Sequence, residues 1–177
     1  MATYIAFLRA INLGATRKFP KDAIKASVEA AGCTDVETYI NTGNVRFDST
    51  LRSRAKVEEA LERAFLADRG FEVPTIVFTP QELAEIAEDA KRFGDGHAGR
   101  HYVSLLKQAP SASAVARLDE LSTAEEVARV GSRAVHLLLG EQYHTAKLTN
   151  AAIEKELGVA TNRNLTVIRT LAERWGA

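Results

Sequence analysis

The chain has 177 residues, of which 46% are hydrophobic and 26% are charged, as is typical of one globular domain or two small ones. Lysine and arginine together number 23 and so do aspartate and glutamate, so the basic excess of nonspecific nucleic-acid binders is absent. With one cysteine, Cys33, an internal disulfide is excluded, and we expect an inert thiol. No charged leader or apolar stretch of about 20 residues is present, which favours the cytoplasm.

The first half of the chain alternates patterns of strand and helix. Residues 3–9 are almost entirely apolar and predict a buried central strand. Pro20 suits the first turn of a helix, and Gly32 suits its end. The other predicted elements are strands over 36–41, 44–48 and 73–79 and a helix whose apolar stripe runs from Val57 to Phe65.

The second half repeats this order less completely. A linking helix is predicted from Pro80, with a capping-box pattern at its start, and residues 92–99, with three glycines, predict a loop. The predicted elements that follow are a strand over 101–106, a helix through Val115 and Leu121, a hairpin of strands 126–130 and 134–139, and a helix through Ile153 ending at Gly158. No final strand is predicted here; a last helix through Leu165 and Trp175 takes its place.

The order β-α-β-β-α-β predicts an α+β protein of two ferredoxin-like halves, a structural duplication with an extra C-terminal helix. We expect a first half over 1–79, a linking helix and loop over 80–100, and a second half over 101–177. The halves should pack together, because each small sheet alone leaves apolar surface exposed.

Three segments carry a resemblance to a known family: the opening Arg9-Ala10-Ile11-Asn12-Leu13-Gly14, the hairpin Thr42-Gly43-Asn44-Val45, and Thr161-Asn162-Arg163-Asn164 with Thr166 following. In order and spacing the chain resembles the bacterial domain-of-unknown-function family 1697 over essentially its whole length. Membership implies the duplicated ferredoxin-like fold and no assigned activity.

Four positions depart from the pattern of that family. Ala15 stands where a second glycine is usual, and Thr42 replaces a serine while keeping the hydroxyl. Ala146 replaces a serine before Lys147, and Leu165 replaces a tryptophan. The last two departures argue against a role for that hydroxyl or for an aromatic platform.

The predicted topology brings polar residues to one end of the first sheet. The loop after the first strand and the hairpin after the second should emerge together. This end would carry the residues Arg9, Asn12, Gly14, Thr42, Gly43 and Asn44. The loop also leads into a helix N-terminus, where N–H groups and the dipole favour an anion.

The same reasoning places Thr161, Arg163 and Asn164 at the corresponding end of the second half, before or at the start of a helix. If the two ends converge, Arg9 and Arg163 could clamp a carboxylate or a phosphate. Lys147 precedes a helix at the opposite end and is a weaker candidate for ligand binding.

Each of these residues also has a structural interpretation. Thr161, Asn162 and Asn164 are common helix caps, and residues 41–44 are common in turns. Arg9 could pair with a carboxylate between the halves. The charged stretch over 52–63 predicts the solvated face of a helix.

Other chemistries lack their motifs. The four histidines, His97, His101, His136 and His144, show no metal-ligand spacing, and we expect them to be solvated or structural. No nucleophile elbow, P-loop or dinucleotide fingerprint occurs, and no metal or cofactor is expected.

Three functions stay open from the sequence. A protein that binds a small anionic metabolite or nucleotide, with or without an enzymatic reaction, is the first. A regulatory or interaction protein, with a homodimer as one form, is the second. A nucleic-acid-binding module is disfavoured by the neutral charge and by the missing strand aromatics.

Overall fold

The computed structural model describes residues 1–177, which form two compact units, Met1–Pro80 and Gln81–Ala177. The fold is α+β, with two four-stranded antiparallel sheets and six α-helices. The first unit contains β1 (Ala2–Leu8), α1 (Lys21–Ala30), β2 (Thr34–Tyr39), β3 (Asn44–Ser49), α2 (Arg54–Arg69) and β4 (Thr75–Phe78). The second contains α3 (Pro80–Phe93, which begins on the last residue of the first unit), β5 (Arg100–Leu106), α4 (Ala112–Glu120), β6 (Glu126–Val130), β7 (Ala134–Leu139), the 3-10 turn η1 (Tyr143–Thr145), α5 (Asn150–Leu157), β8 (Ala160–Asn164) and α6 (Leu165–Trp175).

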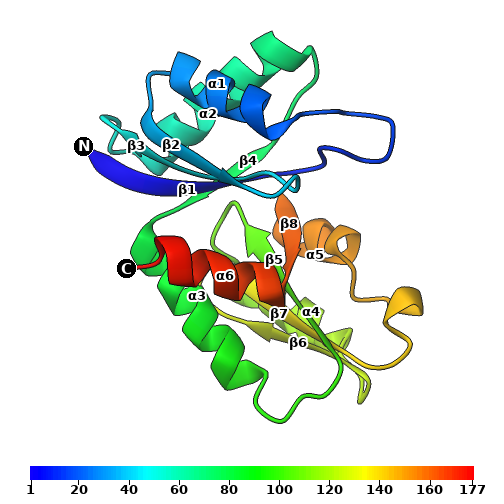
Figure 1. Ribbon diagram of the computed structural model, residues 1–177. Coiled ribbons are helices and arrows are strands. Elements are labelled where there is room, and N and C mark those ends of the chain that lie inside the picture. The colour runs from blue at the N-terminus through cyan, green and yellow to red at the C-terminus, as the bar shows by residue number, and fades with distance from the viewer. The chain divides into compact units, whose positions relative to one another are not determined.

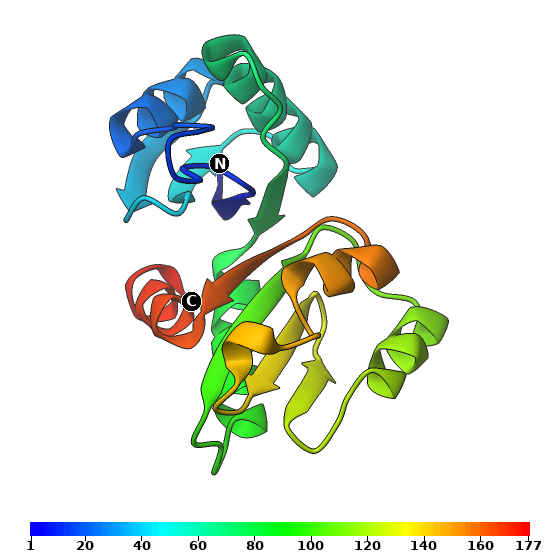
Figure 2. The same cartoon turned by 90° about the vertical axis from the view of Figure 1, so that its right-hand side faces the viewer.

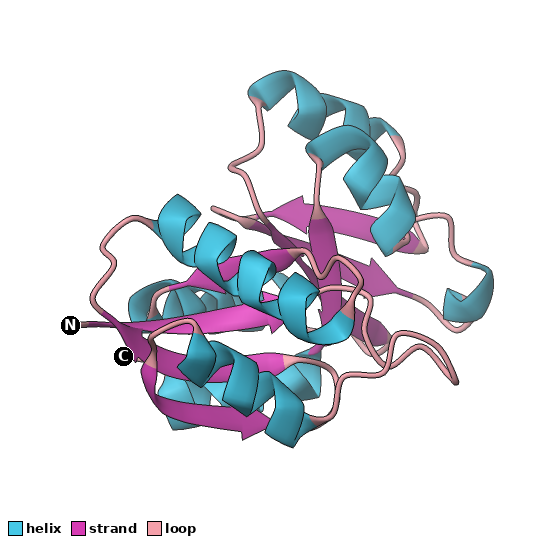
Figure 3. Cartoon of the chain, turned by 90° about the horizontal axis from the view of Figure 1, so that it is seen from above, coloured by secondary structure: helices cyan, strands magenta, loops and turns pink.

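The sheet of the first unit has the strand order β2-β3-β1-β4, with β1 in the centre as its apolar sequence predicts. Helices α1 and α2 lie over one face of this sheet (Figures 1 and 3). That face and the helices form a continuous core in which Phe19 meets Phe65 edge to face at 5.2 Å. On the other face of the sheet, Phe7 and Phe78 pack edge to face at 5.8 Å.

The charged stretch over 52–63 is not wholly solvated, contrary to the prediction from its composition. Glu58 is 4% exposed, and its carboxylate accepts a hydrogen bond of 3.0 Å from the backbone N–H of Val77. Strand β4 is at the edge of the sheet, so this N–H has no neighbouring strand to bond. A buried carboxylate therefore protects the edge of the sheet, a role that the local charge pattern does not reveal.

The sheet of the second unit has the order β6-β7-β5-β8 and lies between two helical layers. Figure 2 shows α4 and α5 on one face of this sheet and α3 and α6 on the other. The predicted hairpin at Gly131 is present, with the Gly131 N–H donating to Ala134 O at 2.8 Å. None of the helices in the protein has the length and apolar character that a membrane crossing requires.

The expectation that the second half lacks its last strand is wrong. Residues 160–164 form β8, which pairs with β5 in an antiparallel register from Leu106↔Ala160 to Tyr102↔Asn164. The sequence Ala-Thr-Asn-Arg-Asn has little of the β-branched and aromatic character of strands. Pairing with β5 therefore decides its conformation. From β5 to β8 the second unit repeats the β-α-β-β-α-β order and the sheet order of the first, with η1 inserted before α5.

Candidate ligand-binding loops

The loop after β1 and the hairpin after β2 meet at one end of the first sheet, as predicted. The backbone N–H of Leu8 donates to Gly43 O at 2.9 Å. The side chain of Asn12 donates to Asn41 O at 2.6 Å. Two segments about thirty residues apart in the chain are therefore joined by direct hydrogen bonds.

Asn12 connects three parts of this end of the unit. Besides the bond to Asn41, its Nδ2 donates to Phe19 O at 3.1 Å and its Oδ1 accepts from Phe19 N–H at 2.7 Å. Its backbone φ is +53°, a left-handed conformation that asparagine tolerates better than most residues. In the first unit its carboxamide therefore organises the loop, and this is a structural role.

The hairpin approaches β1 so closely that only glycine fits at position 43. Gly43 has φ +86°, and a Cβ added there would lie 2.7 Å from Leu8 Cβ and 3.0 Å from Ile11 Cδ1. Asn44 is 1% exposed, and its Nδ2 donates to Tyr39 O at 3.0 Å and to the Thr42 hydroxyl at 2.8 Å. The hairpin motif thus has clear conformational reasons for its glycine and asparagine.

The loop after β1 has an unusual backbone. Ala10, Asn12 and Gly14 have φ of +59°, +53° and +60°, whereas Ile11 and Leu13 between them do not have positive φ. In other proteins, backbone that alternates between positive and negative φ turns successive N–H groups toward a common concavity that binds anions. The N–H groups of Ile11 and Gly14 donate no hydrogen bond within the protein, whereas Leu13 forms an isolated antiparallel bridge with Thr16.

Cationic side chains flank this backbone. Arg9 is half-buried at the start of the loop, where its N–H donates to Pro74 O at 2.9 Å. Arg17 was not predicted from the sequence to matter; its guanidinium donates to the carbonyls of Ala10 and Glu72 and lies 4.6 Å from the centre of the Phe71 ring. Arg17 therefore fixes the loop, and no motif in the sequence signals this.

In the second unit, Thr161 and Arg163 lie within β8 and not at the opening of a helix. Both side chains are buried, at 6% exposed each, and Arg163 Nη1 donates to the Thr161 hydroxyl at 3.0 Å and to Asn162 O at 2.8 Å. Burial lowers the pKa of the Arg163 guanidinium to about 10, so it is charged at neutral pH.

The strand register also corrects which end of the second sheet these residues occupy. Thr161 pairs with Leu105 near the end of β5, as predicted, but Asn164 pairs with Tyr102 near its start. Asn164 caps α6, with its Oδ1 accepting from Val167 N–H at 2.9 Å, which agrees with its structural interpretation. The missed strand caused the error, because β8 carries the chain back across the sheet.

Lys147 is exposed and lies where predicted, at the end of the second sheet where β5 begins. Its backbone N–H donates at 2.6 Å to the carboxylate of Glu126. In the sheet, Leu139 is the register partner of both Glu126 and Arg100, the first residue of β5. The convergence of Arg9 and Arg163 on one concavity stays a prediction, as does the ligand-binding role of the ten residues named from the sequence.

Two of the four histidines form a buried pair between the sheet and α3 of the second unit. His101 Nε2 lies 3.1 Å from His136 Nδ1, and the Phe93 ring lies 5.2 Å from the His136 ring. Burial lowers the pKa of both His101 and His136 to about 4, so both rings are neutral at pH 7. No cluster of three or more metal-ligating side chains is present.

Comparisons with known proteins agree with this architecture. The conserved bacterial protein SP0830 from Streptococcus pneumoniae, a solved structure, is similar with a TM-score of 0.76 and 19% sequence identity, over 99% of this chain and 98% of that one. At this identity the likeness shows the fold alone. No curated protein matches the chain. A family model described as "Protein of unknown function (DUF1697)" matches residues 1–136, and the chain therefore belongs to the DUF1697 family.

Proposed function

We propose that the protein binds a small anion, a phosphate or a carboxylate of a metabolite or nucleotide, at the loop after β1. The observation that carries this proposal is the alternating backbone of Ala10, Asn12 and Gly14, with the unused N–H groups of Ile11 and Gly14. A left-handed backbone conformation costs free energy at any residue other than glycine. Residues held in this conformation are concentrated at functional sites.

The surroundings of the loop support an anion rather than a cation. Lys18 is exposed within the loop, and Arg9 and Arg17 flank it. Helix α1 begins directly after the loop, and its N-cap residue Pro20 offers no side-chain hydrogen bond to the first N–H groups. These N–H groups and the positive end of the helix dipole favour a negative ligand.

The wider setting that we propose rests on the same observations. The repeated element order and sheet order support a duplicated ferredoxin-like unit. The lone Cys33, buried as a free thiol, is compatible with a reducing compartment such as the cytoplasm. No reaction is assigned.

The test is a thermal-shift series with inorganic phosphate, a nucleoside monophosphate and a dicarboxylate, each against chloride at equal ionic strength. We expect one of them to raise the unfolding midpoint and to shift the amide proton resonances of Ile11 and Gly14. Arg9→Gln should weaken the effect, whereas Arg129→Gln, at an exposed arginine of the second unit, should not. The proposal fails if no anion moves these amides, or if the two variants behave alike.

A further inference from the structure

The loop between β1 and α1 is longer than the topology of a unit requires. In both units the last residue of the first strand, Leu8 or Leu106, donates its N–H to the neighbouring hairpin at 2.9 Å. From this shared bond the second unit reaches its helix α4 through residues 107–111, whereas the first unit reaches α1 through residues 9–20. Figure 1 shows this longer loop in blue. The connection between strand and helix therefore does not account for the extra residues.

The first unit also contains backbone that its topology does not require. Every residue other than glycine with positive φ lies in this unit, and the second unit closes its own hairpin, at residues 131–133, without one. The costliest of them is Ile40, at φ +49° in the hairpin after β2, because a branched Cβ fits the left-handed conformation worst. Its side chain is 36% exposed, so burial offsets the cost only in part. Stability therefore does not explain an isoleucine at this position.

A second exposed aliphatic residue lies close to Ile40. Leu13 is 53% exposed and follows Asn12, whose side chain donates to the carbonyl of Asn41, the residue after Ile40. This hydrogen bond joins the chain neighbours of the two aliphatic residues. Leu13 also precedes Gly14, whose N–H is one of the unused donors of the proposed anion site. Exposed aliphatic surface and unused donors thus occur together in the joined loops.

We propose that the ligand of the anion site carries a short aliphatic chain, which packs on Leu13 and Ile40 while its phosphate or carboxylate meets the loop. This inference rests on the proposed function and narrows the class of ligand. The two side chains are branched and aliphatic, so they bury methylene groups but offer no ring on which a nucleotide base could stack. They are also too few to hold a membrane, since even a whole myristoyl chain gives only marginal membrane binding.

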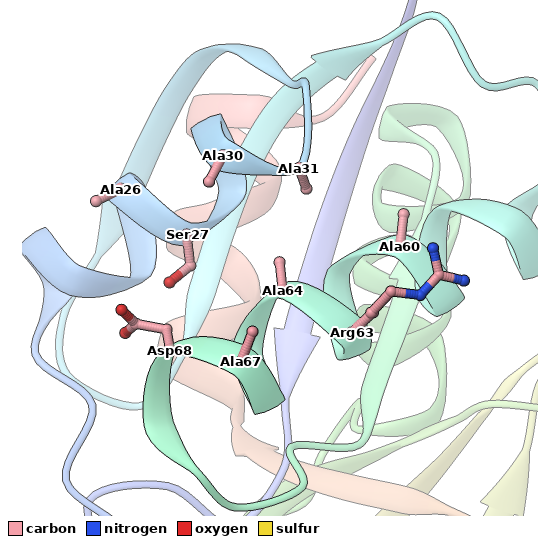
Figure 4. Close-up of a pocket in the computed structure, with 9 residues that line it drawn as sticks. All are labelled: Ala26, Ser27, Ala30, Ala31, Ala60, Arg63, Ala64, Ala67 and Asp68. Atoms are coloured by element: carbon pink, nitrogen blue, oxygen red, sulfur yellow. The ribbon is translucent and has the colours of Figure 1, made fainter.

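An apolar hollow between α1 and α2 is the competing place for an alkyl chain. Its volume is about 630 Å³, and Figure 4 shows that alanine side chains make up most of its lining. Its cation, Arg63, pairs with Glu59 at 2.9 Å, and the carboxylate of Asp68 would repel an anion. The joined loops therefore suit a chain with an anionic end better than this hollow does.

The experiment is a titration of the full chain with two matched pairs of anions, followed by ¹H–¹⁵N and methyl NMR spectra. Methyl phosphate is compared with n-butyl phosphate, and acetate with pentanoate, so that each pair shares one charged group and differs by three methylenes. For the anion that shifts the amides of Ile11 and Gly14, we expect the longer member to bind about tenfold more tightly. Full burial strengthens binding about fourfold per methylene, and this chain stays partly exposed.

Ile40→Asn is the sharpest variant, because asparagine tolerates the left-handed conformation and the protein should fold at least as well. It should raise the unfolding midpoint and reduce the preference for the longer anion to about threefold, as the loss of half of the aliphatic surface predicts. Leu13→Ser should reduce this preference to a similar extent. The matched control is Leu66→Ser, at a leucine of α2 that is 45% exposed, which should keep the preference at about tenfold.

The outcomes separate this inference from the proposed function. If methyl phosphate or acetate shifts the amides of Ile11 and Gly14 but the longer anion binds no more tightly, the aliphatic chain is wrong and the anion site stands. If none of the four anions shifts these amides, both proposals fail. An unchanged preference in Ile40→Asn and Leu13→Ser, or shifts centred on the alanines of the hollow, would also overturn the inference. So would tighter binding to dioleoylphosphatidylglycerol vesicles than to n-butyl phosphate.

Discussion

Replacing Gly43 by alanine tests whether the close approach of the hairpin to β1 stabilises the first unit. At φ +86°, an alanine pays about 1–2 kcal/mol for a left-handed conformation. Its Cβ would also lie 2.7 Å from Leu8 Cβ. The two residues cannot move apart freely, because the Leu8 N–H donates a hydrogen bond to the carbonyl of residue 43. Relief by backbone movement costs about a further 1–3 kcal/mol. We expect a total loss near 3 kcal/mol in the free energy of unfolding.

The assay is urea unfolding followed by circular dichroism, with Gly70→Ala as the matched control. Gly70 has φ +78°, but an added Cβ would meet nothing within 4 Å, so only the conformational cost applies, about 1–2 kcal/mol. With an m-value of about 2 kcal/mol/M, the midpoint should fall by about 1.5 M for Gly43→Ala and by clearly less for Gly70→Ala. Equal losses in the two variants would refute the argument from close approach.

The other predictions concern buried polar groups. His101 and His136 have pKa values of about 4 in the folded protein, whereas an unfolded histidine protonates near pH 6.5. The contribution of this pair to the free energy of unfolding should therefore be full above pH 6.5 and fall by several kcal/mol as the pH drops toward 4. A flat profile in urea titrations from pH 7 to 4.5 would contradict this. Asn12→Ala removes three hydrogen bonds and should cost about 2–3 kcal/mol. Asn12→Asp keeps the acceptor for Phe19 N–H but turns a carboxylate oxygen toward the carbonyls of Phe19 and Asn41, so it should lose at least as much in the same assay. Ser27→Ala should raise the free energy of unfolding by up to about 1 kcal/mol, which would appear as a slightly higher thermal midpoint. A clear loss of stability would mean that the hydroxyl has a partner. Glu58→Ala should cost about 2 kcal/mol while Glu58→Gln, which keeps an acceptor for Val77 N–H, should cost less; identical losses would argue against this bond.

Much of the candidate site followed from local sequence and one topological rule. Asn12 and Gly43 are residues with special backbone tolerance, and the antiparallel order of β1, β2 and β3 brings them to one end of the sheet. The alternation of left-handed residues did not follow, because Ala10 has no intrinsic preference for that conformation. The Arg17 guanidinium holds Ala10 in this conformation by bonding its carbonyl and that of Glu72, which is remote from Ala10 in the sequence.

Hydrophobic periodicity determined where most helices and strands of this protein lie, because alternation and helical stripes are local properties of the chain. The composition excluded an internal disulfide, because the chain has one cysteine. Only the tertiary structure decided that residues 160–164 form a strand. These residues are mostly polar, and they are extended because they pair with β5. Burial of Glu58, pairing of His101 with His136 and the isolation of the Ser27 hydroxyl were decided in the same way. A side chain's hydrogen bonds and solvation depend on neighbours that are remote in sequence, and folding alone brings these neighbours together.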